Sequence, residues 1–136
     1  MEFDTKFVIV IDDELPTWKK LNVVSYLSGG VIGRNSEMLG REYKDKKGNT
    51  YLPLCIQPTI ILKCSRDRLS TILNRSLSRE IEASIFIEDM FITGDDASNR
   101  DTVIKYNTEQ LPLVGIGLRA DKKIIDKVTK GAKMHD

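Results

Sequence analysis

The segment Phe7–Ile11 constrains the fold most, because all five of its residues are apolar. A strand with one solvent-facing side alternates apolar and polar residues, whereas a strand covered on both sides is apolar throughout. This segment is therefore predicted to be a central strand of a sheet. Such a sheet needs helices on both faces, each with one apolar side, and the remaining sequence is expected to supply them.

Three further short segments have the apolar and β-branched composition of strands. They are Thr59–Leu62, Ala83–Ile87 and Leu113–Gly117. With the first strand they predict a three-layer α/β/α sandwich around a four-stranded sheet that is either largely parallel or mixed. The polar stretch Arg41–Asn49 is expected to form an exposed hairpin or loop. A length of 136 residues suits one core of this kind, so we expect a single domain over residues 1–136.

Three segments have the spacing of amphipathic helices, with apolar residues recurring every three or four positions. The first opens at Pro16 and is expected to bury its apolar residues: Trp18, Leu21, Val24, Leu27 and Val31. The second is capped by Ser65 and is expected to turn its arginines to water and to bury a similar set: Leu69, Ile72, Leu73 and Leu77. The third is terminated by Gly131 and has a shorter apolar stripe: Ile124, Ile125 and Val128.

Small residues occur in the first helix, including Ser25 and the pair at 29–30, and again at Gly115 and Gly117. In the helix they allow either close packing on the sheet or the approach of a substrate, and close packing is the favoured interpretation. The two strand glycines lack the third glycine and the position of a phosphate-binding loop. They are expected to allow close helix packing or a bulge.

Composition and residue placement exclude several classes of function. Twenty-one basic and 20 acidic residues give a net charge of +1, so affinity for nucleic acid or membrane would have to come from a local patch. Cys55 and Cys64 lack zinc-site spacing, and His135 is the single histidine, which disfavours Ser-His-Asp or Cys-His catalysis. We expect a reduced, cytoplasmic protein with no metal, cofactor or membrane segment.

The densest polar segment begins at Glu88-Asp89 and continues from Thr93 to Asp101. Functional groups often lie at strand ends in α/β proteins, so this segment is a candidate site. Its candidate binding residues are Thr93, Asp95, Asp96, Asn99 and Arg100. In the alternative interpretation, Asp95 or Asp96 caps a short helix whose polar residues are solvated. The order of a calcium-binding EF-hand loop is missing.

The last part of the sequence is rich in basic residues: Arg119, Lys122, Lys123, Lys127, Lys130 and Lys133. These side chains predict either contacts to the phosphates of RNA or an ordinary solvated helix face. No aromatic residue lies among these lysines, so the segment gives little support for stacking on single-stranded bases.

Together these segments resemble the type II peptidyl-tRNA hydrolase superfamily over nearly the whole chain. The matching segments are Phe7–Ile11 with the helix at 19–31, Gln57–Lys63, Ile87–Asp89, and Gly115–Gly117 followed by Ile125–Thr129. The segments Glu88–Arg100 and Lys130–Lys133, with His135, resemble an uncharacterised branch of that superfamily, domain of unknown function 2000.

The resemblance implies an α/β/α fold with a four-stranded mixed sheet, a homodimer, and an active site beside the first helix and an aspartate. Asp89 matches that aspartate. The hydrolases' helix pattern Lys-x-x-x-Gln-x-x-His is replaced at its key positions by Leu21, Ser25 and Ser28. Lys20 lies one residue from the family lysine, and Pro112 replaces a family threonine. The fold therefore carries over, and most of the catalytic set does not.

Two functions follow as hypotheses. In the first, the protein is a diverged hydrolase of a tRNA-linked or related ester, in which Asp89 orients water and Lys20 or Arg100 stabilises negative charge. The basic final segment would then hold tRNA phosphates.

In the second hypothesis, the protein is a binding domain without catalysis. The small residues of the first helix, Ser25 among them, and the loop at 93–100 form its pocket. A small anionic or nucleotide-like ligand would meet Arg100, Lys130 and His135, while the polar loop residues Asp95, Asp96 and Asn99 select its other groups.

Overall fold

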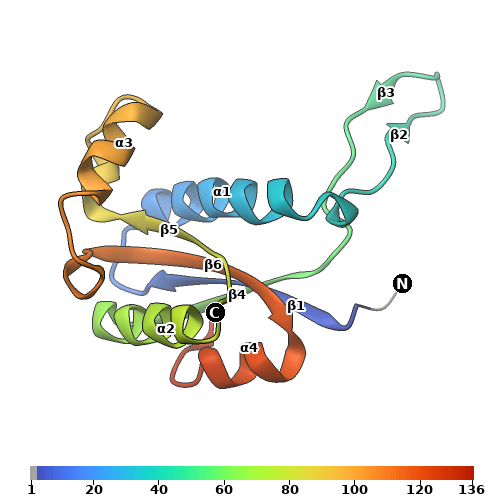
Figure 1. The fold of residues 1–136 in the computed structure, drawn as a ribbon. Coiled ribbons are helices and arrows are strands. Elements are labelled where there is room, and N and C mark those ends of the chain that lie inside the picture. Colours follow the sequence, from blue (N-terminus) through green and yellow to red (C-terminus); the bar gives the residue numbers. More distant parts are fainter. Residues whose placement is uncertain (1–2) are drawn as a thin grey trace.

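The structure is a computed structural model that describes residues 3–136. Its centre is a five-stranded mixed sheet in the order β5-β6-β1-β4-β7 (Figure 1). The strands are β1 (Thr5–Asp12), β4 (Thr59–Cys64), β5 (Ala83–Ile87), β6 (Leu113–Asp121) and β7 (Lys133–Met134). Strand β1 runs parallel to β4 and antiparallel to β6, while β5 and β7 are antiparallel to their neighbours.

The expectation of four strands is therefore wrong, because the sheet has a fifth strand. The additional strand, β7, pairs Lys133 and Met134 with β4. Two residues are too few to show the alternation that identifies a strand in a sequence, so the pattern gave no signal for it.

Helices cover both faces of the sheet. Helix α1 (Thr17–Arg34) covers one face, and α2 (Arg66–Ser78) with α4 (Lys122–Val128) covers the other (Figure 1). Helix α3 (Asp96–Val103) follows β5 through the short 3-10 turn η2 (Glu88–Phe91). Two hydrophobic clusters fill the two helix–sheet interfaces, which makes the architecture the predicted α/β/α arrangement. Within residues 3–136, no helix has the length and apolar character needed to span a membrane.

Strand β1 is buried on both faces, as its sequence predicts. Phe7, Ile9 and Ile11 pack in the cluster under α1, and Val8 and Val10 pack in the opposite cluster. None of the five side chains is more than 2% exposed. The strand therefore sets the boundary between the two cores.

Helix α1 buries two of the residues expected, Leu27 and Val31, but not the first two. Trp18 and Leu21 are 60% and 68% exposed, and the helix packs through Val23, Leu27 and Val31. Two glycines of β6 explain this register. A Cβ atom at position 115 would lie 2.5 Å from Val23 Cγ1, and one at position 117 would lie 3.3 Å from Val31 Cγ2. The close approach predicted for these glycines is confirmed, and it determines which side of the helix is buried.

Helices α2 and α4 also depart from expectation at single positions. Leu77 is 51% exposed, because Ser76 takes the inward position one turn after Ile72 and donates its hydroxyl to the Ile72 carbonyl at 2.8 Å. Ile124 is 38% exposed. The capping prediction for α2 is confirmed, since Ser65 Oγ accepts from the Arg68 amide.

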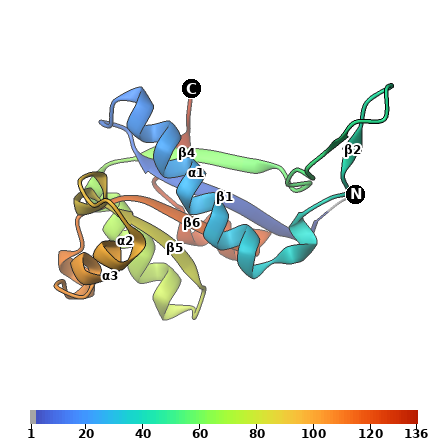
Figure 2. The ribbon, with the colours of Figure 1, turned by 90° about the horizontal axis from the view of Figure 1, so that it is seen from above.

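The polar stretch at 41–49 forms a two-stranded hairpin, β2 (Tyr43–Lys44) with β3 (Thr50–Tyr51), that projects from the body of the protein (Figures 1 and 2). Asp45 closes its turn by accepting hydrogen bonds from the Tyr51 hydroxyl, the Asn49 side chain and two backbone amides. These donors, the Tyr51 hydroxyl first, lower the pKa of Asp45 to about 2. The predicted exposed hairpin is confirmed.

The packing of α1 on β6 generates a stability test. Gly115→Ala adds a methyl group 2.5 Å from Val23 Cγ1 and is expected to destabilise the protein by about 1–3 kcal/mol, because the helix must shift outward. Gly94→Ala is the control, since no atom lies within 4 Å of the added Cβ. Urea unfolding measures both variants, and equal stabilities would contradict the close-packing account.

Candidate functional site

A cleft of about 620 Å³ opens at the carboxyl ends of β1 and β4. Because the two strands are parallel, their carboxyl ends meet at the same edge of the sheet, and α2 begins there. We call it the carboxyl-edge cleft. It is lined by Asp12, Asp13, Glu14, Lys63, Cys64, Ser65, Arg66, Arg68, Gly131 and Lys133.

The guanidinium group of Arg66 connects the ends of three strands. Asp12, at the end of β1, is 1% exposed and accepts from Arg66 Nε at 2.7 Å and from the Glu14 amide at 2.9 Å. Arg66 follows β4, and its Nη2 atom donates to Glu88 Oε2, which follows β5, at 2.7 Å. The hydrogen bond to Asp12 is the main cause that raises the pKa of Arg66. Arg66 was expected to face water only, and instead it neutralises a buried carboxylate.

A second charged network lies beside the first. Lys20 Nζ is 3.4 Å from Asp13 Oδ1 and 3.0 Å from His135 Nε2. Lys63 Nζ is 2.7 Å from Asp136 Oδ1 and 3.9 Å from Asp13 Oδ1. The Lys63–Asp136 hydrogen bond raises the pKa of Lys63 and lowers that of Asp136. Asp13 therefore faces two ammonium groups, one from α1 and one from β4.

The contacts of His135 define its tautomer. An ammonium group only donates, so His135 Nε2 accepts from Lys20. The other ring nitrogen, Nδ1, lies 2.8 Å from the backbone oxygen of Asp136, which accepts its proton. These two contacts fit the Nδ1–H tautomer, in which Nε2 faces the lysine.

Two cations of the cleft have no acidic partner among residues 3–136. Within the described residues, neither Arg68 nor Lys133 forms an ion pair. Gly131 has a φ of +101°, and a Cβ atom there would lie 2.6 Å from Arg68 Nε. The glycine therefore lets the guanidinium lie against the backbone of the segment before β7. These two side chains are the basic groups still available to a ligand.

The structure places Lys20 and His135, two of the predicted site residues, in direct contact across 115 positions of sequence. Asp89 is placed elsewhere. Its carboxylate accepts from the Tyr106 hydroxyl at 2.9 and 3.2 Å, which raises the pKa of Tyr106. In the part of the chain that the structure describes, no hydrogen bond or ion pair joins Asp89 to Lys20, and the neighbouring Glu88 enters the charged network instead.

The other predicted residues do not converge on one pocket. Asp95 caps α3 by accepting from the Ser98 amide at 2.7 Å, which bears out the capping alternative. Asp96 pairs with Arg100 one turn along α3, and the Thr93 hydroxyl donates to Asn99.

Sheet order separates this segment from the last predicted residues. Helix α3 follows β5 at one edge of the sheet, whereas Lys130 and His135 flank β7 at the other. Ser25 is exposed on α1. Arg100 is therefore not brought together with Lys130 and His135.

The sequence contains a pattern that could have predicted the remaining residues of the cleft. Acidic residues at 12–14 directly follow a buried strand, and basic residues at 63–68 surround the end of the next strand along the chain. Pairing those strands in parallel brings the two sets together. The sequence predicted a largely parallel or mixed sheet, but it did not specify which strands pair in parallel.

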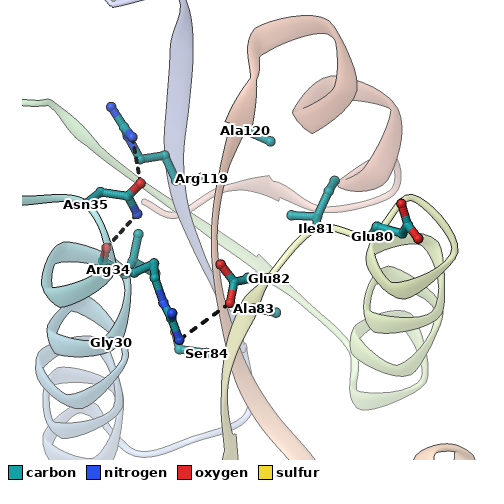
Figure 3. A pocket seen from close by; sticks show the side chains of 11 residues that line it. Gly30, Arg34, Asn35, Glu80, Ile81, Glu82, Ala83, Ser84, Arg119 and Ala120 are labelled. Atoms are coloured by element: carbon teal, nitrogen blue, oxygen red, sulfur yellow. Dashed lines mark hydrogen bonds and ion pairs between the residues drawn. The ribbon is translucent and has the colours of Figure 1, made fainter.

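A second cavity, of about 470 Å³, lies at the opposite end of the sheet between α1 and β5 (Figure 3). Both of its arginines are already paired. Arg119 Nη1 donates to Asn35 Oδ1 at 3.0 Å, and Arg34 pairs with Glu82 (Figure 3). Arg119 Nη1 also pairs with Glu37 at 2.9 Å. The Arg119 side chain is only 11% exposed, so it is not part of an exposed basic patch with the lysines that follow it. Among residues 3–136, no group of three His, Cys, Asp or Glu side chains is placed to hold a metal ion.

Comparison with known proteins identifies relatives of this chain. Residues 5–136 match the family described as "Protein of unknown function (DUF2000)". A solved structure, that of the protein of unknown function Atu0240 from Agrobacterium tumefaciens strain C58, is 44% identical in sequence. The alignment covers 99% of this chain and 100% of that chain, with a TM-score of 0.96. No curated protein matches.

The thiol in the cleft generates a pH prediction. Burial raises the pKa of Cys64 from 9.0 to about 11. Its thiolate fraction at pH 8 is then about 100-fold below that of an unperturbed thiol, so alkylation by iodoacetamide slows by the same factor. The rate should keep rising with pH until about pH 11. The Cys55→Ser variant isolates Cys64 for mass spectrometry, and labelling at pH 8 as fast as free cysteine would contradict this description of the cleft.

Proposed function

The chain belongs to the DUF2000 family of proteins of unknown function, and we propose that it binds a small ligand carrying a phosphate or carboxylate group in the carboxyl-edge cleft. The observation that carries this proposal is that Arg68 and Lys133 both line the cleft and form no ion pair within residues 3–136. The cleft volume of about 620 Å³ lies within the usual range for small-ligand sites.

The protein's own carboxylate supports the choice of an anion. Asp136 places an oxygen 2.7 Å from Lys63 Nζ, on a lysine that lines the cleft. Asp136 itself is 86% exposed at its side chain, so this contact is open to exchange with an external anion. A ligand carboxylate or phosphate oxygen would meet the same donor, with Arg68 and Lys133 in addition.

Acidic side chains in the same cleft restrict the ligand further. Asp12 is saturated by Arg66 and by a backbone amide, whereas Glu14 is exposed and, within the described residues, forms no ion pair. Asp13 shares its charge with two lysines. A ligand that combines its anionic group with hydroxyl or amino donors should bind more tightly than a simple anion, because its donors can meet these carboxylates.

A second candidate function, ester hydrolysis, is favoured by the contact between Lys20 and His135. An imidazole activates water when its basic nitrogen turns from the Lys20 ammonium group to the water, and the released ammonium group then stabilises a developing oxyanion. Both groups are present at the edge of the cleft, and the Asp136 carbonyl fixes the imidazole tautomer. The resemblance to type II peptidyl-tRNA hydrolases supports a tRNA-linked or related ester as the substrate. In this proposal His135, and not Asp89, is the base.

Calorimetric titration with inorganic phosphate and pyrophosphate tests the binding proposal. Wild type should bind pyrophosphate with a Kd of about 1 mM or below, and Arg68→Ala with Lys133→Ala should weaken binding at least about 10-fold, because charge-assisted hydrogen bonds are lost. Arg34→Ala, in the second cavity, is the matched control and should leave the Kd unchanged. Equal binding by the double variant and wild type would overturn the proposal.

Turnover of a model peptidyl-tRNA tests the second candidate separately. His135→Gln and Lys20→Met should each lower kcat at least about 100-fold, because a base or an oxyanion donor is removed. Asp89→Asn should change kcat less than about 3-fold, since Asp89 contacts Tyr106 and not the Lys20–His135 pair. A wild type without turnover, or a loss confined to Asp89→Asn, would rule out this assignment of roles.

A further inference from the structure

We propose that the imidazole ring of His135 and the residue Asp136, together called the latch, regulate the carboxyl-edge cleft. In the closed latch, the Asp136 carboxylate occupies the position of the ligand's anionic group. A ligand anion that takes this position opens the latch and frees the imidazole from Lys20. The inference rests on the anion binding proposed above and adds how that same site is regulated.

The Asp136 carboxylate already lies where a ligand anion would bind. Its Oδ1 atom is 2.7 Å from Nζ of Lys63, and Lys63 lines the cleft. Within the described residues, its only other basic contact is the neighbouring His135, at 3.6 Å. A ligand anion approaching Lys63 is repelled by this carboxylate, so the two compete for one ammonium group.

The latch is held less firmly than the chain before it. Arg75 Nη1 donates to two backbone carbonyls that precede Gly131, at 3.2 and 2.8 Å, and β7 pairs with β4. The His135 amide continues this pairing by donating to the Ile61 carbonyl at 3.0 Å. The Asp136 side chain, by contrast, is 86% exposed, and groups with few buried contacts move at little cost in free energy. The latch can therefore open while β7 stays in place.

The two parts of the latch are linked to each other as well as to the cleft. His135 Nδ1 lies 2.8 Å from the backbone oxygen of Asp136, and His135 Nε2 lies 3.0 Å from Lys20 Nζ. When Asp136 leaves Lys63, this backbone oxygen moves with it, and the imidazole loses the acceptor that orients it toward Lys20. Opening at one lysine therefore loosens the contact at the other.

Exposure and charge set the size of the competition. An exposed ion pair is weak, so Asp136 is expected to lower the affinity for a ligand anion by no more than about 5-fold. Pyrophosphate carries more negative charge than one carboxylate, and it can also contact Arg68 and Lys133 in the cleft. It is therefore expected to displace Asp136 when it saturates the site.

The latch also gives the second candidate function a dependence on substrate. While the latch is closed, His135 Nε2 faces Lys20 and is not available to a water molecule. An anionic substrate that displaces Asp136 frees the imidazole and leaves Lys20 with Asp13, at 3.4 Å. The base is then exposed only after the substrate has bound, as in enzymes whose site is completed by a conformational step.

Nuclear magnetic resonance of the imidazole tests the link between the two lysines. His135 is the single histidine of the chain, so its ring signals are unambiguous. The ¹⁵Nε2 signal of Lys20→Met gives the position for a ring without the ammonium contact. At about pH 8, where an ordinary imidazole is neutral, the signal of ligand-free Lys63→Met should shift at least about half of the way to that position. Wild type saturated with pyrophosphate should shift in the same direction.

Calorimetric titration with pyrophosphate measures the competition itself. Asp136→Asn should bind pyrophosphate about 3-fold to 5-fold more tightly than wild type, because the competing carboxylate is removed. Glu14→Gln is the matched control, since Glu14 is also an exposed carboxylate of the cleft and forms no ion pair within residues 3–136. This variant loses the same charge without opening the latch, and its Kd should change less than about 2-fold at about 0.15 M salt.

The outcomes separate this inference from the binding proposal. The latch is wrong if wild type binds pyrophosphate and Asp136→Asn gains no more affinity than Glu14→Gln, or if the His135 signal is unchanged in Lys63→Met. Either result leaves the binding proposal intact. Absence of pyrophosphate binding by both wild type and Asp136→Asn would overturn the binding proposal and the latch together.

Discussion

The burial of β1 on both faces is the constraint from which the rest of the structure follows. No residue from Phe7 to Ile11 is free to be polar, so the polar groups of this strand are confined to its ends. At its carboxyl end Asp12 is still buried, and a buried carboxylate needs a cation and hydrogen-bond donors. Arg66 provides the cation and extends it to Glu88, so that three strand ends are joined. The charged cleft is therefore a consequence of how the central strand terminates.

The groups around this edge differ in how firmly they are held. The Asp12 carboxylate is buried and has two donors, which makes it a fixed part of the fold. Lys63 and Asp136 form an exposed pair that contributes little to stability, and Arg68 and Lys133 have no acidic partner within residues 3–136. The buried Asp12 carboxylate is thus fixed, whereas the exposed charges around it can exchange their partners for a ligand. That division is suited to binding a ligand without disturbing the sheet.

The sequence predicted the layers and main elements because periodicity depends on local residues. Strand β5 was predicted with the bounds it has, and the caps at Ser65 and Asp95 were identified from residue type. The buried side of α1 was predicted only in part, because Gly115 and Gly117 on a distant strand select it. The Lys20–His135 contact was missed for the same reason: β7 and its pairing with β4 bring together residues 115 positions apart. Asp89 was favoured over Glu88 by resemblance, while the fold directs Glu88 to Arg66.

Binding of an anion in the carboxyl-edge cleft is the central claim, and nuclear magnetic resonance tests it most directly. Amide chemical shifts of the ¹⁵N-labelled chain would be followed during titration with inorganic phosphate at constant ionic strength. The account predicts saturable changes concentrated at residues 12–14, 63–68 and 131–133, which line the cleft. Changes that are absent, that rise without saturation, or that cluster around Arg34 and Arg119 at the opposite cavity would contradict it.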